Sequence, residues 1–225
     1  MIDRIDRGCS SYENTGTRLE EEFIGSINKR KYKEEAYNYL HSKDKPLSED
    51  PGEKFEQILQ RREAAQMEFE KALDLIKQGN YINYKDSMDL VEKCQIGNPE
   101  KPTQFFSAAL YNKIKDAFSE KYTLKFFTST GVTHLDVLHG VDCFFKLYED
   151  GKEMTLATID LTGNRDKDKS RADVLIQIKQ AERDKYDPSK NNKNFNKEFF
   201  DNQIENFSQL ITQAMLDNYN QKNSN

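Results

Sequence analysis

Two aspartates, Asp142 and Asp160, stand inside short runs of β-branched and aromatic residues, VDCFFKLY and TLATIDLT. Such runs are typical of buried strands, where an ionised carboxylate is costly unless something binds it. Because side chains alternate along a strand, Asp160 and Thr162 are predicted to share one face, opposite to Leu161. If the runs pair as neighbouring strands, the aspartates converge, and carboxylate oxygens suit Mg²⁺ or Mn²⁺. The sequence therefore predicts a metal site formed by Asp142 and Asp160.

Each aspartate taken alone also has a structural explanation. Asp160 can end a strand and bond the backbone of the following turn, and Asp142, close after Gly140, can occupy a β-bulge. The joint order and the shared faces are what favour metal binding. His134 and His139 lie nearby, but their odd spacing places them on opposite faces of a strand, and the sequence offers no third zinc ligand in a known pattern. A zinc site is not expected.

The apolar spacing predicts helices followed by strands. Helical periodicity occupies residues 17–40, with a break expected near Gly25, then 51–78, 84–94, 103–121 and, at the C-terminal end, 199–217. Strand-like composition occupies 123–131, 141–148, 155–162 and 172–178, and Asp150-Gly151 predicts a hairpin between the second and third of these runs. Residues from Asn218 onwards are expected to be disordered. The change in amino-acid composition at Gly97 to Pro102 predicts a boundary between a mainly helical region, 1–101, and an α/β core, 102–225.

Composition narrows the class of protein. The chain has 225 residues, a formal net charge of -5 and three cysteines without a CxxC pair. No run approaches the ~20 apolar residues of a membrane span, and the N-terminal residues lack the apolar core of a signal peptide. A reducing, cytoplasmic location without membrane association is expected, or a virion if the gene is phage-encoded. The acidic total excludes a non-specific nucleic-acid coat, although basic residues gather after Asp160: Arg165, Lys167, Lys169, Arg171 and Lys179.

The order of helix 104–121, Gly140-Val141-Asp142 and Ile159-Asp160-Leu161-Thr162 resembles the restriction-endonuclease-like, or PD-(D/E)XK, nuclease family. The resemblance covers about the last 120 residues. It implies an α+β fold with a mixed sheet flanked by helices, metal ligation by Asp142 and Asp160, and hydrolysis of phosphodiester bonds. It also implies a nucleic-acid partner, with DNA ranked ahead of RNA. The N-terminal helical region lies outside the resemblance and is a candidate surface for a protein partner.

The resemblance places a catalytic lysine at position 162, which is Thr162. A threonine hydroxyl can orient water but is not a general base near neutral pH. Lys179 and Lys169 are the preferred replacements, ahead of Lys146. A glutamate contributed by the first core helix of the family would have to come from Glu20, Glu21 or Glu22. Three functions therefore stay open: a metal-dependent nuclease, a catalytically impaired nuclease-like protein that binds nucleic acid or serves in assembly, and a helical interaction protein whose α/β half is only a scaffold.

Overall fold

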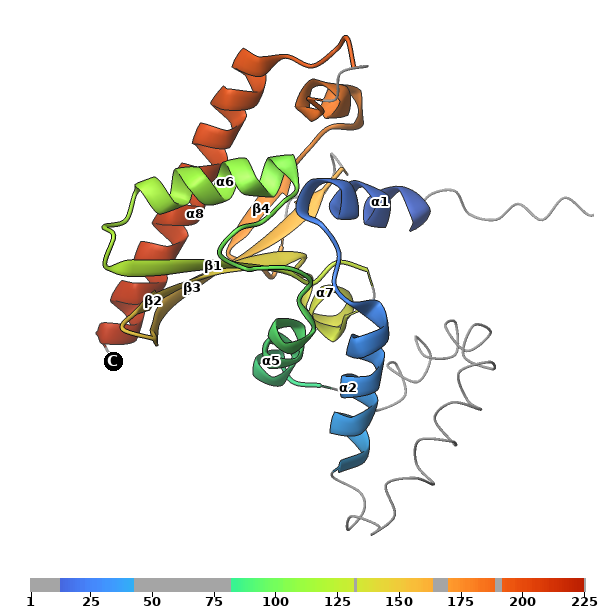
Figure 1. The fold of residues 1–225 in the computed structure, drawn as a ribbon, viewed down its shortest axis with the longest axis vertical. Helices are drawn as coiled ribbons and strands as arrows, with labels where there is room; N and C mark the ends of the chain where they lie inside the picture. Colours follow the sequence, from blue (N-terminus) through green and yellow to red (C-terminus); the bar gives the residue numbers. More distant parts are fainter. Residues whose placement is uncertain (1–12, 43–81, 132, 164–169, 189–191, 225) are drawn as a thin grey trace, which may run out of the picture.

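The computed structural model describes residues 13–131, except 43–81, and residues 133–224, except 164–169 and 189–191. The helix expected at 51–78 and the candidate Lys169 therefore lie outside the described residues. The fold is α+β, with a four-stranded mixed sheet flanked by helices, as expected (Figure 1). Its elements, in order, are α1 (Glu13–Ile24), α2 (Lys29–Ser42), α5 (Tyr84–Cys94), α6 (Phe105–Asp116), β1 (Tyr122–Thr128), α7 (His134–His139), β2 (Cys143–Glu149), β3 (Lys152–Thr162), β4 (Val174–Gln177), η1 (Gln180–Tyr186) and α8 (Lys197–Asn223).

The sheet has the strand order β1-β2-β3-β4, in which β1, β2 and β3 are antiparallel and β4 runs parallel to β3. The predicted hairpin is confirmed. Asp150 and Gly151 join β2 to β3 with φ angles of 50° and 78°, as a turn with two left-handed central residues requires. The strand predicted within 172–178 is confirmed as β4.

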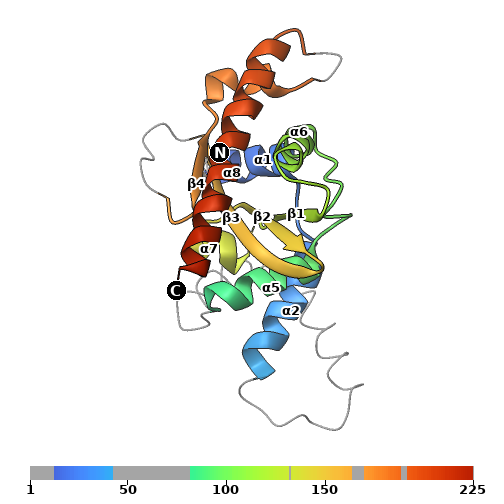
Figure 2. The same cartoon turned by 90° about the vertical axis from the view of Figure 1, so that its left-hand side faces the viewer.

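Two cores lie on opposite faces of the sheet. Helices α6 and α8 cover one face, while α5 and α7 lie against the other (Figure 2). The alternation predicted for β3 is confirmed, because Ile159 and Leu161 belong to the core with α6 and α8, whereas Asp160 does not. In β2, Phe145 faces the same core and Phe144 faces the other. The sheet thus presents Asp160 on the side of α5 and α7, and Asp142 lies immediately before the first residue of β2.

Helices α1 and α2 are separated at Gly25, where a φ of 88° ends the first helix, as predicted. The disorder expected from Asn218 is wrong, because α8 continues to Asn223. Two side chains tie its last turns to β3: Asn218 Nδ2 donates to the Leu156 carbonyl at 3.0 Å, and Lys222 Nζ donates to the Glu153 carbonyl at 3.4 Å. A short-range sequence pattern carries no sign of these contacts.

The apolar stripe of α8 is buried against the sheet and α6, as predicted, through Phe200, Ile204, Phe207 and Ile211. Helix α1 contributes to that same core through Leu19, Phe23 and Ile24. The boundary at Gly97 to Pro102 stays a prediction that limited proteolysis can check. Among the described residues, no helix combines the length and apolar character needed to cross a bilayer.

Candidate metal centre

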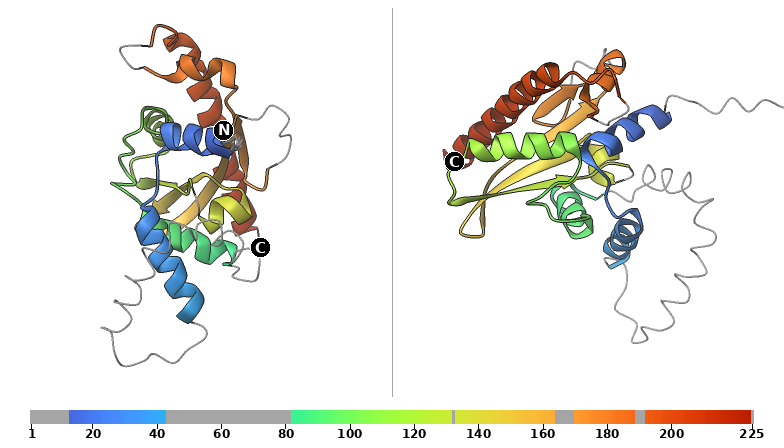
Figure 3. Two further views of the ribbon diagram at one scale, coloured as in Figure 1. Left: turned by 90° about the vertical axis from the view of Figure 1, so that its right-hand side faces the viewer. Right: turned by 45° about the horizontal axis from the view of Figure 1, so that its top comes forward.

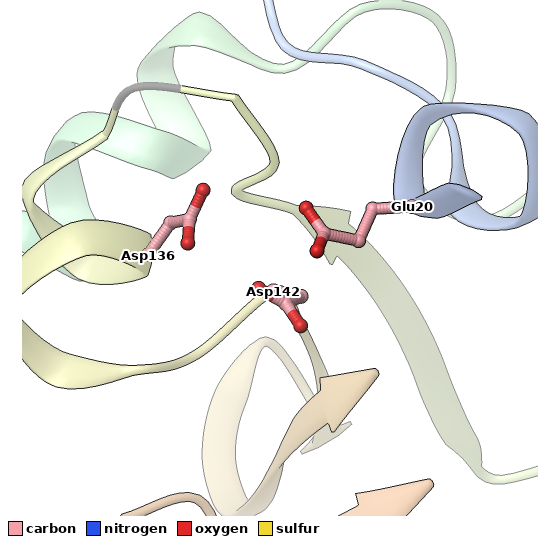
Figure 4. Close-up of side chains that lie close together, drawn as sticks. All are labelled: Glu20, Asp136 and Asp142. Atoms are coloured by element: carbon pink, nitrogen blue, oxygen red, sulfur yellow. The ribbon is translucent and has the colours of Figure 1, made fainter. Parts of the chain in front are cut away.

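Three carboxylates from separate parts of the fold meet at one point. Glu20 of α1, Asp136 of α7 and Asp142, immediately before β2, each offer an oxygen atom, and these oxygens all lie within 4.8 Å of one another (Figure 4). A cation held about 2.1 to 2.6 Å from each ligand spans oxygens at most ~4.2 to 5.2 Å apart. The three side chains therefore need little movement to share one divalent cation.

Asp142 is fixed by its backbone and by its side chain. Its N–H donates to the Ile159 carbonyl at 2.9 Å, and its own carbonyl accepts from the Ser129 N–H at 2.8 Å. Its Oδ2 atom accepts from the Leu161 N–H at 2.6 Å. Only 5% of the residue is exposed. These bonds place the carboxylate at the junction of β1, β2 and β3 without freedom to turn towards solvent.

Asp136 is aimed by the N-terminus of α7. The Thr133 side chain caps the helix by accepting from the Asp136 N–H at 3.1 Å, and donates to the Ser129 carbonyl at 2.7 Å. The Gly131 N–H donates to Asp136 Oδ2 at 3.0 Å. Gly131 has a φ of 103°, and a methyl group there would lie 2.9 Å from Lys29 Cε. Glycine therefore allows the close approach of Lys29 beside the Asp136 carboxylate.

Glu20 is presented by α1, whose apolar side is anchored in the core by Leu19 and Phe23. Its two neighbours have other partners, because Glu21 pairs with Lys29 and Glu22 pairs with Arg183. Of the three glutamates that the sequence offered for the helix position, Glu20 is the one in the carboxylate group.

The electrostatics of the group centre on Asp142. Burial, followed by the charges of Glu20 and Asp136, raises the pKa of Asp142 to about 9. The Leu161 N–H opposes this rise by bonding the carboxylate, and Asp160 adds a smaller increase. The raised pKa favours the protonated form of Asp142 when no cation is bound. A divalent cation would take the place of that proton, since both relieve the same repulsion.

Asp160 is also buried, with 3% exposed, but it is not a member of the group of three. The β2–β3 register pairs Cys143 with Ile159, so Asp142 and Asp160 are the next residues along the two strands. Asp160 Oδ2 accepts from the Ser170 hydroxyl at 2.8 Å. That Asp142 and Asp160 bind one cation together stays a prediction. Glu20 and Asp136 are additional candidate ligands beside Asp142.

The lysine candidates lie in different surroundings. Thr162 is the last residue of β3, and its carbonyl accepts from the Ile178 N–H at 2.9 Å. Lys179 lies between the end of β4 and the start of η1, and its side chain is exposed. Lys146 is buried in ion pairs with Glu92 at 2.6 Å and Glu153 at 2.7 Å, which supports a structural role.

Asp136 is the member of the group that the sequence interpretation did not place. A signal existed, because Thr133 and Asp136 have the spacing of a helix N-cap followed three residues later by an acid. That pattern indicates the helix α7. In a helix the Asp136 side chain points in a different direction from the one that it would take in a strand. His134 and His139 have partners outside the group, Tyr32 Oη at 3.1 Å and the Ile82 carbonyl at 3.2 Å respectively.

Two shallow surface depressions lie between α6 and α8 in the described part of the chain, and neither is lined by a carboxylate of the group. Comparison of the chain with protein-family models, with curated proteins and with solved structures gives no match. Function is therefore inferred from the carboxylate group itself.

Proposed function

We propose that Glu20, Asp136 and Asp142 bind a divalent cation, Mg²⁺ or Mn²⁺, and that the protein is a metal-dependent nuclease-like protein that hydrolyses phosphodiester bonds in nucleic acid. The observation that supports this proposal is the convergence of three carboxylates from three elements on one point. The three carboxylates repel one another at this distance, and a bound cation would relieve that repulsion.

The donor set fits a hard cation. All three side chains offer carboxylate oxygens, the ligands that Mg²⁺ and Mn²⁺ prefer, and none offers sulfur or imidazole. Acidic groups also gather on protein surfaces without an ion, but there solvent screens their repulsion. Asp142 is almost fully buried, and the charges of Glu20 and Asp136 raise its pKa. An interior carboxyl held in this way opposes folding at neutral pH unless it is neutralised.

The chain's own residues have defined tasks in this proposal. Asp142, held by the Leu161 N–H, would be an ionised ligand to the cation, and Asp136 and Glu20 would complete the ligand set from the two helices. A bound cation supplies the positive charge that polarises a phosphodiester and makes water a better nucleophile. Thr162 follows Asp160 on the same face of β3, and its hydroxyl is suited to orienting that water but not to removing its proton.

A second function is favoured by one observation. Position 162 holds threonine, and Lys146 is occupied by Glu92 and Glu153. A site that binds the cation but has no lysine at position 162 would serve a nucleic-acid-binding or assembly component in place of an enzyme.

The test compares two substitutions on the same helix. Glu20→Gln removes a proposed ligand, and Glu22→Gln makes the same change at an exposed glutamate of α1 that pairs with Arg183. Melting temperatures are measured in EDTA and with millimolar Mg²⁺ or Mn²⁺, and end-labelled DNA and RNA are incubated with each protein. We expect the native protein and Glu22→Gln to be stabilised by the cation and to cleave, and Glu20→Gln to do neither.

The outcomes separate the two functions. A cation-dependent rise in melting temperature without cleavage of DNA or RNA selects the binding function. Absence of any rise for the native protein rejects the metal site. Asp160→Asn decides whether the predicted pair also matters, because loss of the rise would add Asp160 to the ligands and an unchanged rise would exclude it.

A further inference from the structure

Helix α2 carries an unusual set of charges at its beginning. Its first five residues, KRKYK, contain Lys29, Arg30, Lys31 and Lys33, and its first turn contains no acidic residue. The N-terminus of a helix carries partial positive charge, so cations there weaken the helix and anions stabilise it. The four cations are exposed in the folded chain. These cations repel one another and oppose the positive end of the helix, and an external anion would relieve that repulsion.

Three of the cations share one face with an aromatic residue. At roughly 100° per residue, Lys29, Lys33, Tyr37 and Arg30 fall within an arc of about 100° around α2. Tyr37 is 39% exposed, which is high for a large ring. Lys31 lies on another side and donates to the Lys93 carbonyl at the end of α5, where it has a structural task. We call Lys29, Arg30, Lys33 and Tyr37 the basic face of α2.

The basic face begins beside the carboxylate group. Lys29 lies over Gly131, whose N–H donates to Asp136 Oδ2 at 3.0 Å, and from there α2 leads away from the sheet (Figure 3). Lys29 pairs with Glu21, and Arg30 pairs with Glu34 at 3.4 Å. Exposed pairs of this kind contribute little to stability, so phosphate groups can replace the carboxylate partners without unfolding the helix.

We propose that a nucleic-acid strand lies along the basic face of α2, with phosphates on Lys29, Arg30 and Lys33 and a base against the ring of Tyr37. This inference rests on the proposed function only in that the strand then leads into the carboxylate group. Cations that follow a backbone, combined with an aromatic ring on which a base stacks, are the recurring elements of single-strand binding. The partner is therefore a nucleic acid, in spite of the chain's net charge of -5.

The experiment measures binding of a fluorescein-labelled single-stranded DNA by anisotropy, in EDTA, over a series of KCl concentrations. The test variant is Arg30→Gln/Lys33→Gln, which leaves Lys29 and its contact at Gly131 in place. The matched control is Lys115→Gln/Lys152→Gln, which removes the same charge from exposed positions on α6 and β3. We expect the test variant to bind roughly ten-fold or more weakly at 0.1 M salt, with a log–log salt slope smaller by about 1.4, and the control to bind as the native protein does.

Tyr37 gives an independent readout. Tyr37→Ala should weaken binding about five-fold with an unchanged salt slope, while Tyr37→Phe should bind like the native protein, because stacking needs the ring and not the hydroxyl. A labelled RNA of the same sequence shows which nucleic acid is preferred.

Several results would overturn the inference. These are no binding by the native protein, equal losses in the test and control double variants, or binding to anionic lipid vesicles but not to the oligonucleotides. Failure of the proposed function looks different. If the native protein shows no cation-dependent melting shift while the basic-face variants still lose oligonucleotide binding, the metal site is rejected and the binding face stands. If the cation shift and cleavage are present while Arg30→Gln/Lys33→Gln binds normally, only the binding face is rejected.

Discussion

Replacing Asp142 with asparagine should stabilise the protein in the absence of a cation, and increasingly so as the pH rises. Burial and the charges of Glu20 and Asp136 raise the pKa of Asp142 to about 9 in the folded chain, against about 3.9 for an unfolded aspartate. Between these values the folded state holds a proton that the unfolded state has released. Stability therefore falls as the pH rises through this window, by about 1.4 kcal/mol per pH unit for one proton.

Asparagine has nearly the same shape as aspartate but carries no group that titrates. Its carbonyl oxygen can still accept from the Leu161 N–H, the bond that Asp142 Oδ2 now makes at 2.6 Å. Near pH 4 the protonated aspartate and asparagine should be similar in stability. At pH 7 the variant should be more stable by up to about 4 kcal/mol, the product of three pH units and the slope. Other groups titrate in both proteins, so their contributions cancel in the difference.

The assay is urea unfolding followed by circular dichroism, in EDTA, at unit pH steps between 5 and 8. The free energy of unfolding of Asp142→Asn minus that of the native protein should grow steadily across the series. Saturating Mg²⁺ should then reverse the order at pH 8, because only the native protein keeps the full ligand set. A difference that does not change with pH, or a variant less stable than the native protein at pH 8 in EDTA, would refute the electrostatic account of the site.

Three further outcomes are expected. Binding of Mg²⁺ at pH 7 should release about one proton, which calorimetry in two buffers of different ionisation enthalpy measures, because the cation displaces the proton of Asp142; a heat that is independent of the buffer would contradict this. Phe207→Ala should lower the free energy of unfolding by about 3 to 5 kcal/mol, because the ring is buried beside Phe106, and a loss under ~1 kcal/mol in urea unfolding would show that α8 is not held by this core. Thr162→Lys should raise the rate of cleavage of labelled DNA by adding a positive charge two residues after Asp160 in β3, and an unchanged rate would remove position 162 from the chemistry.

The elements set by local patterns were predictable from the sequence. The stripe of Phe200, Ile204 and Ile211 repeats at helical spacing, and the side chains of β3 alternate between a polar and an apolar face, so each pattern states which side is buried. The pair Asp150-Gly151 likewise predicts the turn that it forms. In each case the information lies within a few residues of the feature that it determines.

The composition of the site was only partly predictable. Asp142 was expected because a charge inside an apolar run stands out, whereas Asp136 lies in a segment where the helix α7 decides the direction of the side chain. Glu20 was one of three adjacent glutamates, and the choice among them depends on how α1 docks through Leu19 and Phe23. Arg183, which engages Glu22, lies 161 positions further along the chain, so no short window of sequence contains that contact.

The distance along the chain between the three carboxylates has a kinetic consequence. Glu20 and Asp142 are separated by 122 positions, the difference of their residue numbers, and meet only after α1 has docked beside the start of β2. Closing so long a loop is an entropic cost that the chain meets late, once most native contacts exist. A cation that binds this group should therefore leave the rate of folding nearly unchanged and lower the rate of unfolding. It would stabilise the native state without stabilising the transition state for folding.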